Sequence, residues 1–75
     1  MIEVVKAKYL KDYQIMVFFN DGKNGIVDLK NDLWGEVFAP LKDVKKFKNF
    51  KVEFDTIAWA NGADFAPGFL YNKLQ

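Results

Sequence analysis

The sequence predicts an α+β domain: an antiparallel sheet, made of a three-stranded meander plus a two-strand segment, with one or two short helices packed on it. Three stretches in the first thirty residues combine β-branched and aromatic side chains and are separated by polar turns, which is typical of a meander. Further on, apolar residues spaced by three favour a helix, and two short apolar stretches before Pro67 favour strands. The expected order is β-β-β-α-β-β-α.

Length and composition place these elements in a single domain, residues 1–75. A chain of this length buries only ~60% of the surface that its unfolded form exposes, so its stability margin is small. The sequence compensates with 51% apolar and 17% aromatic residues, since each aromatic ring buries roughly 150–250 Å². Apolar surface left over would suit a protein partner or a homodimer.

The first three strands are expected at residues 2–10, 13–19 and 26–29. The second is apolar on both faces, which is typical of a central strand or of one that a partner covers. Asp21-Gly22 predicts a tight turn before the third strand, because Gly tolerates positive φ. Alternation predicts two sets of side chains that each share a face: Val5, Ala7 and Tyr9, and Ile15, Val17 and Phe19.

Residues 31–41 contain Gly35 and Pro40, which argue against one long helix. We expect a loop with a short helical turn there. A helix over about residues 43–50 should follow, with Asp43 as its N-cap. The apolar side chains expected to cover the sheet edge are Leu33, Trp34, Val37, Phe38 and Leu41, and those expected on the helix stripe are Val44, Phe47 and Phe50.

The last third of the chain predicts two more strands and a helix. Residues 51–54 alternate, which places Val52 and Phe54 inward. Residues 56–59 predict the fifth strand. Residues 67–74 predict a short helix, since Pro67 suits its first position.

The side chains that most enzyme mechanisms need are absent. There is no His, Cys, Ser or Arg, and Thr56 is the only aliphatic hydroxyl, which we attribute to turn chemistry. Nucleophile–imidazole pairs and imidazole or thiolate metal ligands are therefore excluded. Asp28, Asp32 and Glu36 are spaced by four, as on one face of a helix, but Gly35 argues against a helix there. We expect no enzyme activity, no cofactor, no metal and no small-molecule substrate.

The segment 42–51 is the best candidate for binding nucleic acid or an acidic protein. Lysines can neutralise phosphates while aromatic rings stack on bases. The simpler interpretation is an amphipathic helix with Phe47 and Phe50 in the core and a solvated lysine face. The near-neutral charge of +1 and the lack of Arg weaken the nucleic-acid interpretation. The candidate binding residues are Lys42, Lys45, Lys46 and Lys48.

The densest cluster of special residues is WANGADFAP, residues 59–67. Its simplest interpretation is a corner in which Asn61-Gly62 turns the chain and Asp64 caps the following helix. The alternative is an edge presented to a protein partner. Trp is favoured at interface hot spots, so the candidate partner-binding residues are Trp34, Trp59, Asn61 and Asp64.

The longest apolar run is residues 15–19, and the first residues carry no signal-peptide pattern. The chain also has no Cys, which fits a reducing compartment. We expect a cytoplasmic protein with no membrane contact.

The chain resembles the small bacterial family known as domain of unknown function 2442. The matching pieces are Asp21-Gly22, Val27-Asp28-Leu29, the run Gly35-Glu36-Val37-Phe38-Ala39-Pro40-Leu41-Lys42-Asp43, and Trp59-x-Asn61-Gly62-Ala63-Asp64-x-x-Pro67 followed by Leu70-Tyr71. Ala60 and Gly68 depart from the Pro and the acidic residue that are common there.

The resemblance implies a β-rich α+β domain without established catalytic residues. It also implies gene neighbourhoods similar to toxin–antitoxin pairs, and a fusion to a helix-turn-helix domain in some relatives. We therefore expect a non-enzymatic protein-interaction module, in one reading the antitoxin-like member of a two-gene pair. The alternative is a weak nucleic-acid-binding or regulatory domain that uses residues 42–51.

Overall fold

The computed structural model of the chain describes residues 1–74. It contains a three-stranded antiparallel sheet, a two-stranded antiparallel hairpin and two short α-helices, which confirms the predicted α+β fold and its order. The elements are β1 (Val4–Lys11), β2 (Gln14–Phe19), β3 (Asn24–Asp28), the 3-10 helices η1 (Lys30–Asp32) and η2 (Ala39–Lys42), α1 (Val44–Phe47), β4 (Lys51–Glu53), β5 (Thr56–Ala58) and α2 (Pro67–Asn72).

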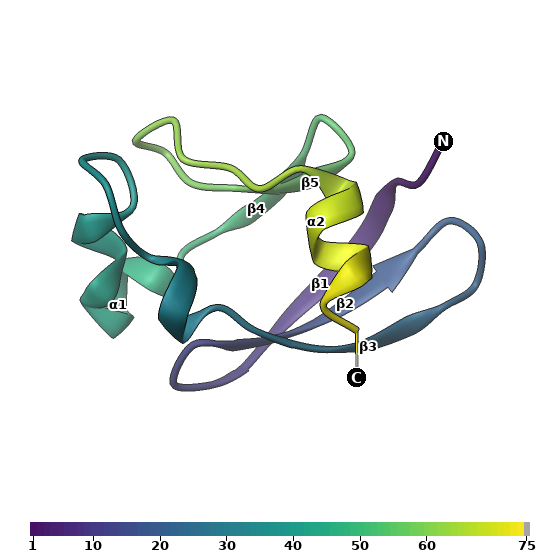
Figure 1. Cartoon of the computed structure of the whole chain (residues 1–75), viewed down its shortest axis with the longest axis horizontal. Coiled ribbons are helices and arrows are strands. Elements are labelled where there is room, and N and C mark those ends of the chain that lie inside the picture. Colours follow the sequence, from purple (N-terminus) through teal and green to yellow (C-terminus); the bar gives the residue numbers. More distant parts are fainter. Residues whose placement is uncertain (75) are drawn as a thin grey trace.

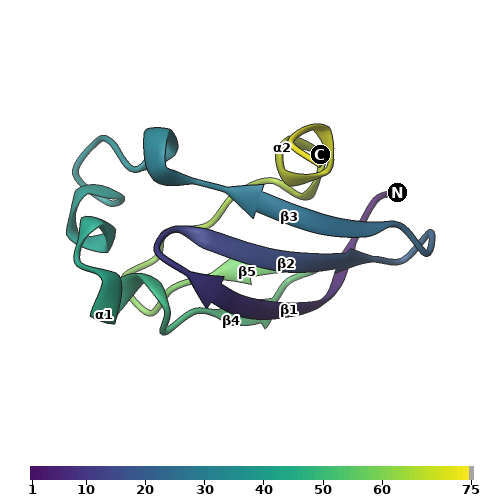
Figure 2. The same ribbon diagram turned by 90° about the horizontal axis from the view of Figure 1, so that it is seen from below.

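The two sheets form two layers. Figure 1 shows the hairpin β4-β5 above the three-stranded sheet, with α1 at one end, and Figure 2 shows α2 along the side of the molecule nearest β3. The buried apolar side chains between these elements form one cluster. No helix within residues 1–74 is long and apolar enough to cross a bilayer.

Strand β2 lies between β1 and β3, as its two apolar faces predict. Ile15, Val17 and Phe19 are buried on its inner face, while Met16 and Phe18 are half-buried on the outer one. The turn after β2 uses Gly22 at φ 91°, where a glycine avoids the strain that other residues meet. The inner face of β2 therefore forms one side of the hydrophobic core.

The face that Val5, Ala7 and Tyr9 were predicted to share is wrong at the start of β1. Val5 is 56% exposed and Val4 is buried instead. Val4 pairs with Phe19 and Lys6 pairs with Phe18, so Val5 is the extra residue of a β-bulge. A bulge reverses the alternation for the residues before it, while Ala7 and Tyr9 still pack against the core.

The inward orientation predicted for Val52 and Phe54 is also wrong. Phe54 is 89% exposed because Phe54 and Asp55 form the two-residue turn between β4 and β5, with φ 53° and 65°. Every residue of β4 is exposed, whereas β5 is buried at two of its three positions. Strand β5 covers the core, and β4 lies at its margin.

The helices are shorter than predicted. Asp43 caps α1 as expected, since its carboxylate accepts a hydrogen bond from the backbone N–H of Lys45 at 3.0 Å. The helix ends at Phe47 rather than near residue 50, yet Phe47 is fully buried and Phe50 still packs on the core. Helix α2 begins at Pro67 as predicted and ends at Asn72.

Candidate functional site

Two sequence segments that stood out separately meet in space. The Asn61 side-chain N–H donates to the backbone carbonyl of Val37 at 2.9 Å, and the Trp59 indole N–H donates to that of Phe47 at 2.7 Å. A buried polar group costs free energy unless it is hydrogen-bonded, so the Trp59 contact satisfies the indole in the core. Asn61 and Trp59 therefore hold the segment after β5 against the loop and helix that precede β4.

The turn within WANGADFAP is built as predicted, but the cap is not. Gly62 has φ 92°, and the Asn61 side chain accepts a hydrogen bond from the Ala63 backbone N–H at 3.1 Å. The N-cap of α2 is Ala66, which makes no side-chain cap bond, so the predicted capping role of Asp64 is wrong. Asp64 instead extends the hairpin through a backbone bridge to Ala58 and is exposed.

The only aliphatic hydroxyl is also part of the core rather than of a turn. Thr56 is 5% exposed, and its hydroxyl donates to the backbone carbonyl of Phe65. This bond fixes the position of Phe65, which the sequence did not mark as functional. The ring of Phe65 lies at the centre of an aromatic cluster, because it contacts the rings of Phe38, Trp59 and Phe69.

Three phenylalanine rings of this cluster stack in a row. The rings of Phe38 and Phe65 have centroids 4.6 Å apart, and those of Phe65 and Phe69 are 5.4 Å apart and nearly parallel at 10°. Together with Asp32 and Trp34 they line a cavity of about 210 Å³. We call this set the aromatic pocket: Asp32, Trp34, Phe38, Phe65 and Phe69.

The two tryptophans differ in exposure. Trp34 is 74% exposed, so it does not cover the sheet edge as predicted, and Val37 is exposed too. Trp59 is 6% exposed and packs on Phe47 and Phe65. Trp34 offers an aromatic surface. The largely buried Trp59 instead contributes a wall to two other cavities, one of about 330 Å³ beside Asn61 and one of about 240 Å³ beside Lys51.

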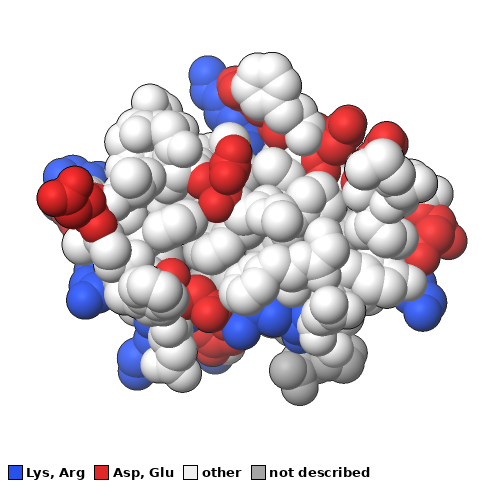
Figure 3. Space-filling view, turned by 45° about the horizontal axis from the view of Figure 1, so that its top comes forward, with Lys and Arg blue, Asp and Glu red and all other residues white. Residues whose placement is uncertain are grey.

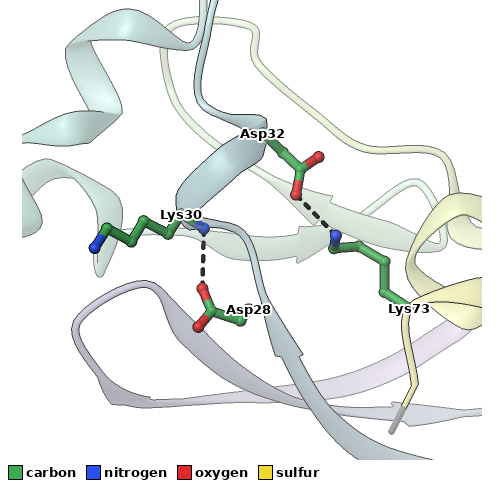
Figure 4. A network of polar contacts seen from close by, with 4 residues as sticks. All are labelled: Asp28, Lys30, Asp32 and Lys73. Carbon is green, nitrogen blue, oxygen red and sulfur yellow. Dashed lines mark hydrogen bonds and ion pairs between the residues drawn. The ribbon is translucent and has the colours of Figure 1, made fainter.

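The three carboxylates spaced by four in the sequence take separate roles. Asp28 accepts a hydrogen bond from the Lys30 backbone N–H at 3.0 Å, and Asp32 pairs with the Lys73 ammonium at 3.0 Å. Figure 4 shows the Asp32 side chain reaching from η1 to Lys73 beyond α2, while Lys30 points away from it. Glu36 is exposed. Within residues 1–74 no group of three His, Cys, Asp or Glu is placed to hold a metal.

The face of the molecule drawn in Figure 3 is mostly apolar, with acidic groups among the apolar ones. Figure 3 views the molecule from the side of α2 and the segment before it: white and red atoms fill the middle, and blue atoms lie mostly towards the edges. Asp32 lines the aromatic pocket, and Glu36 and Asp64, which are close in sequence to its Trp34 and Phe65, are exposed. A partner that covers this face would gain from carrying positive charge.

The lysine segment forms a separate surface. Lys42, Lys45, Lys46 and Lys48 are all exposed, as predicted. Phe47 is fully buried, so it is a core residue and cannot stack on a base. The segment presents charge without the exposed ring that the nucleic-acid interpretation needed from this position.

Of the residues predicted to bind a partner, the structure brings Trp34 to the aromatic pocket and leaves Trp59, Asn61 and Asp64 outside it. Sequence reasoning missed Phe38, Phe65, Phe69 and Lys73. Phe65 and Phe69 are four apart, a spacing that brings side chains together on a helix. That spacing was available in the sequence, but Phe65 precedes the helix, and its position depends on the contact with Thr56.

Comparison with known proteins gives one family. Residues 4–75 match the family described as "Protein of unknown function (DUF2442)". No curated protein and no solved structure shows significant similarity to the chain.

Proposed function

The chain belongs to the family of domains of unknown function 2442, and from this premise we propose that it is a small, non-enzymatic protein-interaction module. The observation that carries the proposal is the 74% exposure of Trp34 beside a stacked row of phenylalanines. Large aromatic side chains are favoured at the centres of protein interfaces. A covered Trp34 would bury apolar area that the isolated chain leaves in water.

The residue types of the chain, and the hydrogen bonds of Thr56, Trp59 and Asn61, support the non-enzymatic part of the proposal. His, Cys, Ser and Arg are absent from the sequence. The hydroxyl of Thr56 is buried and engaged with a backbone carbonyl, so it is not free to act as a nucleophile. The polar groups of Asn61 and Trp59 hold neighbouring backbone in the same way.

We further propose that the partner is the product of a neighbouring gene, with this chain as the antitoxin-like member of the pair, in the cytoplasm. The gene arrangement implied by the family resemblance supports this choice. We add that the partner carries a basic surface, because Asp32 lines the same cavity as Trp34 and Glu36 is exposed two residues further along the chain. A homodimer would cover Trp34 with a second copy of the same face.

Site-specific photo-crosslinking tests the proposal. A photoreactive amino acid replaces Trp34 in one strain and Val5 in another, each expressed with the neighbouring gene. Val5 is a matched control because it is exposed and apolar but lies on β1. We expect a discrete crosslinked product from position 34 and none from position 5. A monomer by light scattering, with no product from position 34, would refute the proposal.

A second candidate function, weak nucleic-acid binding, rests on the four exposed lysines at positions 42, 45, 46 and 48. Lysine–phosphate contacts make affinity fall steeply with salt. Replacing Lys45, Lys46 and Lys48 by Glu should abolish any salt-dependent binding to a DNA or RNA duplex. Binding that survives these replacements would eliminate the candidate.

A further inference from the structure

The aromatic pocket has the chemistry of a site for a positively charged group. The faces of aromatic rings carry negative charge density and attract cations within about 6 Å of the ring centre. Here Trp34, Phe38, Phe65 and Phe69 line a cavity of about 210 Å³, and Asp32 contributes an acidic residue to the same lining. Trp34 is the best cation-binding ring among them.

A cation of the chain itself already lies at the edge of the pocket. The Lys73 ammonium is 3.0 Å from Asp32 Oδ2 and 5.5 Å from the centre of the Phe69 ring. The same Asp32 oxygen is shielded from solvent and makes no hydrogen bond among the described residues, and the Lys73 ammonium is the cation that lies against this oxygen. Lys73 shows that ring and carboxylate can hold a cation together.

We propose that the aromatic pocket binds an arginine side chain of the protein partner, which displaces Lys73 from Asp32. This rests on the proposed interaction function and names the group that is recognised. A guanidinium is flat, so it can stack on Trp34 or Phe69 while its N–H groups pair with the carboxylate of Asp32, whereas an ammonium acts as a point charge. A second copy of the chain cannot supply the group, because the chain has no Arg.

The rigidity of the pocket supports this assignment. Phe65 is stacked between Phe38 and Phe69, is 8% exposed, and is held by the Thr56 hydroxyl through its backbone carbonyl. The floor of the pocket is therefore preformed, which lowers the entropy cost of binding. Trp34, Phe69 and Lys73 are the parts that remain partly in solvent.

The test is an NMR titration of the whole chain with N-acetylarginine amide. The two indole N–H signals report separately, because Trp59 is bonded to the Phe47 carbonyl inside the core and does not line the pocket. We expect a saturable shift of the Trp34 signal, with the Trp59 signal unchanged as evidence of an intact fold. N-acetylcitrulline amide, which is neutral, should give no shift.

Variants separate binding from structure. Asp32→Asn and Trp34→Ala should each weaken binding about tenfold. Lys73→Ala should strengthen it, because it removes the competing cation, whereas Lys30→Ala should change nothing since Lys30 points away from Asp32 (Figure 4). Weaker or equal binding in Lys73→Ala would overturn the proposal, as would equal binding of N-acetyl-lysine amide.

The outcomes also separate this inference from the proposed function. Crosslinking from position 34 together with no arginine-induced shift would leave the interaction module in place and remove the arginine assignment. An arginine-induced shift, together with a monomer by light scattering and no crosslinked product from position 34, would support the pocket and refute the proposed function.

Discussion

Asp21 joins two elements that lie 50 residues apart in the chain. One carboxylate oxygen accepts the Lys23 backbone N–H at 3.0 Å within the β2–β3 turn, and the other accepts the Tyr71 hydroxyl of α2 at 2.7 Å. The backbone N–H of Lys23 and then the Tyr71 hydroxyl hold the pKa of Asp21 below its ordinary value of 3.8. Hydrogen bonds to the charged form favour ionisation.

This contact predicts a pH dependence of stability. Because the folded-state pKa is the lower one, ionised Asp21 stabilises the fold above about pH 3.8, and the contribution is lost as the pH falls through the folded pKa. Asp21→Asn should therefore lower the melting temperature at neutral pH, and its difference from the parent chain should shrink in acid. Thermal melts from pH 2 to 7 measure this.

Tyr71→Phe is the matching variant, since it removes one of the two hydrogen bonds and keeps the ring, which packs edge-on against Phe19 at 5.0 Å. It should reproduce part of the Asp21→Asn effect. A difference between Asp21→Asn and the parent that stays constant with pH would contradict the linkage.

At the scale of elements, the β4–β5 hairpin is closed by a turn in which Phe54 is poorly suited to its conformation. Phe54 and Asp55 have φ 53° and 65°, as a type I′ turn requires at both central positions. Outside Gly, Asn and Asp this left-handed region costs roughly 1–2 kcal/mol per residue. Phe54 gains little in return within the chain, because it is 89% exposed.

Replacing the turn should stabilise the protein. Phe54→Asn with Asp55→Gly supplies the Asn-Gly pair that type I′ turns favour. A gain of about 1 kcal/mol would raise the melting temperature by roughly 4–8 °C in a domain of this size. Phe54→Ala is the control, since it removes the ring but keeps a Cβ at positive φ. An equal gain in Phe54→Ala would show that ring exposure, not the turn, is responsible.

The elements that periodicity predicts well are those whose residues all lie in one regular stretch. The alternation of Ile15, Val17 and Phe19 predicted the buried face of β2, and the Asp43 cap predicted the start of α1. Val5 and Phe54 were misplaced because a bulge and a positive-φ turn interrupt the alternation. Neither interruption involves Gly or Pro. Asp55 does mark a break between the two strands, but nothing local shows that Phe54 belongs to the turn or that Val5 is a bulge.

At the scale of the whole molecule, all buried apolar residues belong to one cluster that draws on both sheets and both helices. Leu70 of α2 and Ile57 of β5 are fully buried in it beside Ile15 of β2. A shared core makes the elements depend on one another. If residues 1–75 form a single domain, as expected, they should therefore unfold cooperatively.

Leu70→Ala tests that cooperativity. Truncating a fully buried leucine costs about 2–5 kcal/mol, a large share of the stability expected for a small domain. Melts followed by far-ultraviolet circular dichroism and by the fluorescence of buried Trp59 should shift together to lower temperature. Phe69→Ala, at a position 40% exposed, should cost less. Two separate transitions would contradict a single domain.

The aromatic pocket could not be predicted as a unit from the sequence. Its members come from η1, from the loop before η2, from the segment after β5 and from α2, so only the folded chain brings them together. Trp34 was predicted because tryptophan marks interfaces by residue type alone. The ion pair between Asp32 and Lys73 could not be predicted, because it depends on the position of η1 next to the end of α2 (Figure 4).

The central place of β2 also bears on aggregation. Residues 14–19 contain no charge, Pro or Gly, the composition of segments that stack into cross-β fibrils when they are exposed. In the folded chain β1 and β3 occupy both hydrogen-bonding edges of this strand. Lys11, Asp12 and Asp21 flank it, where charges oppose stacking of chains. Loss of folding would therefore expose a segment whose composition favours fibrils, and the folded chain keeps both edges of that segment paired.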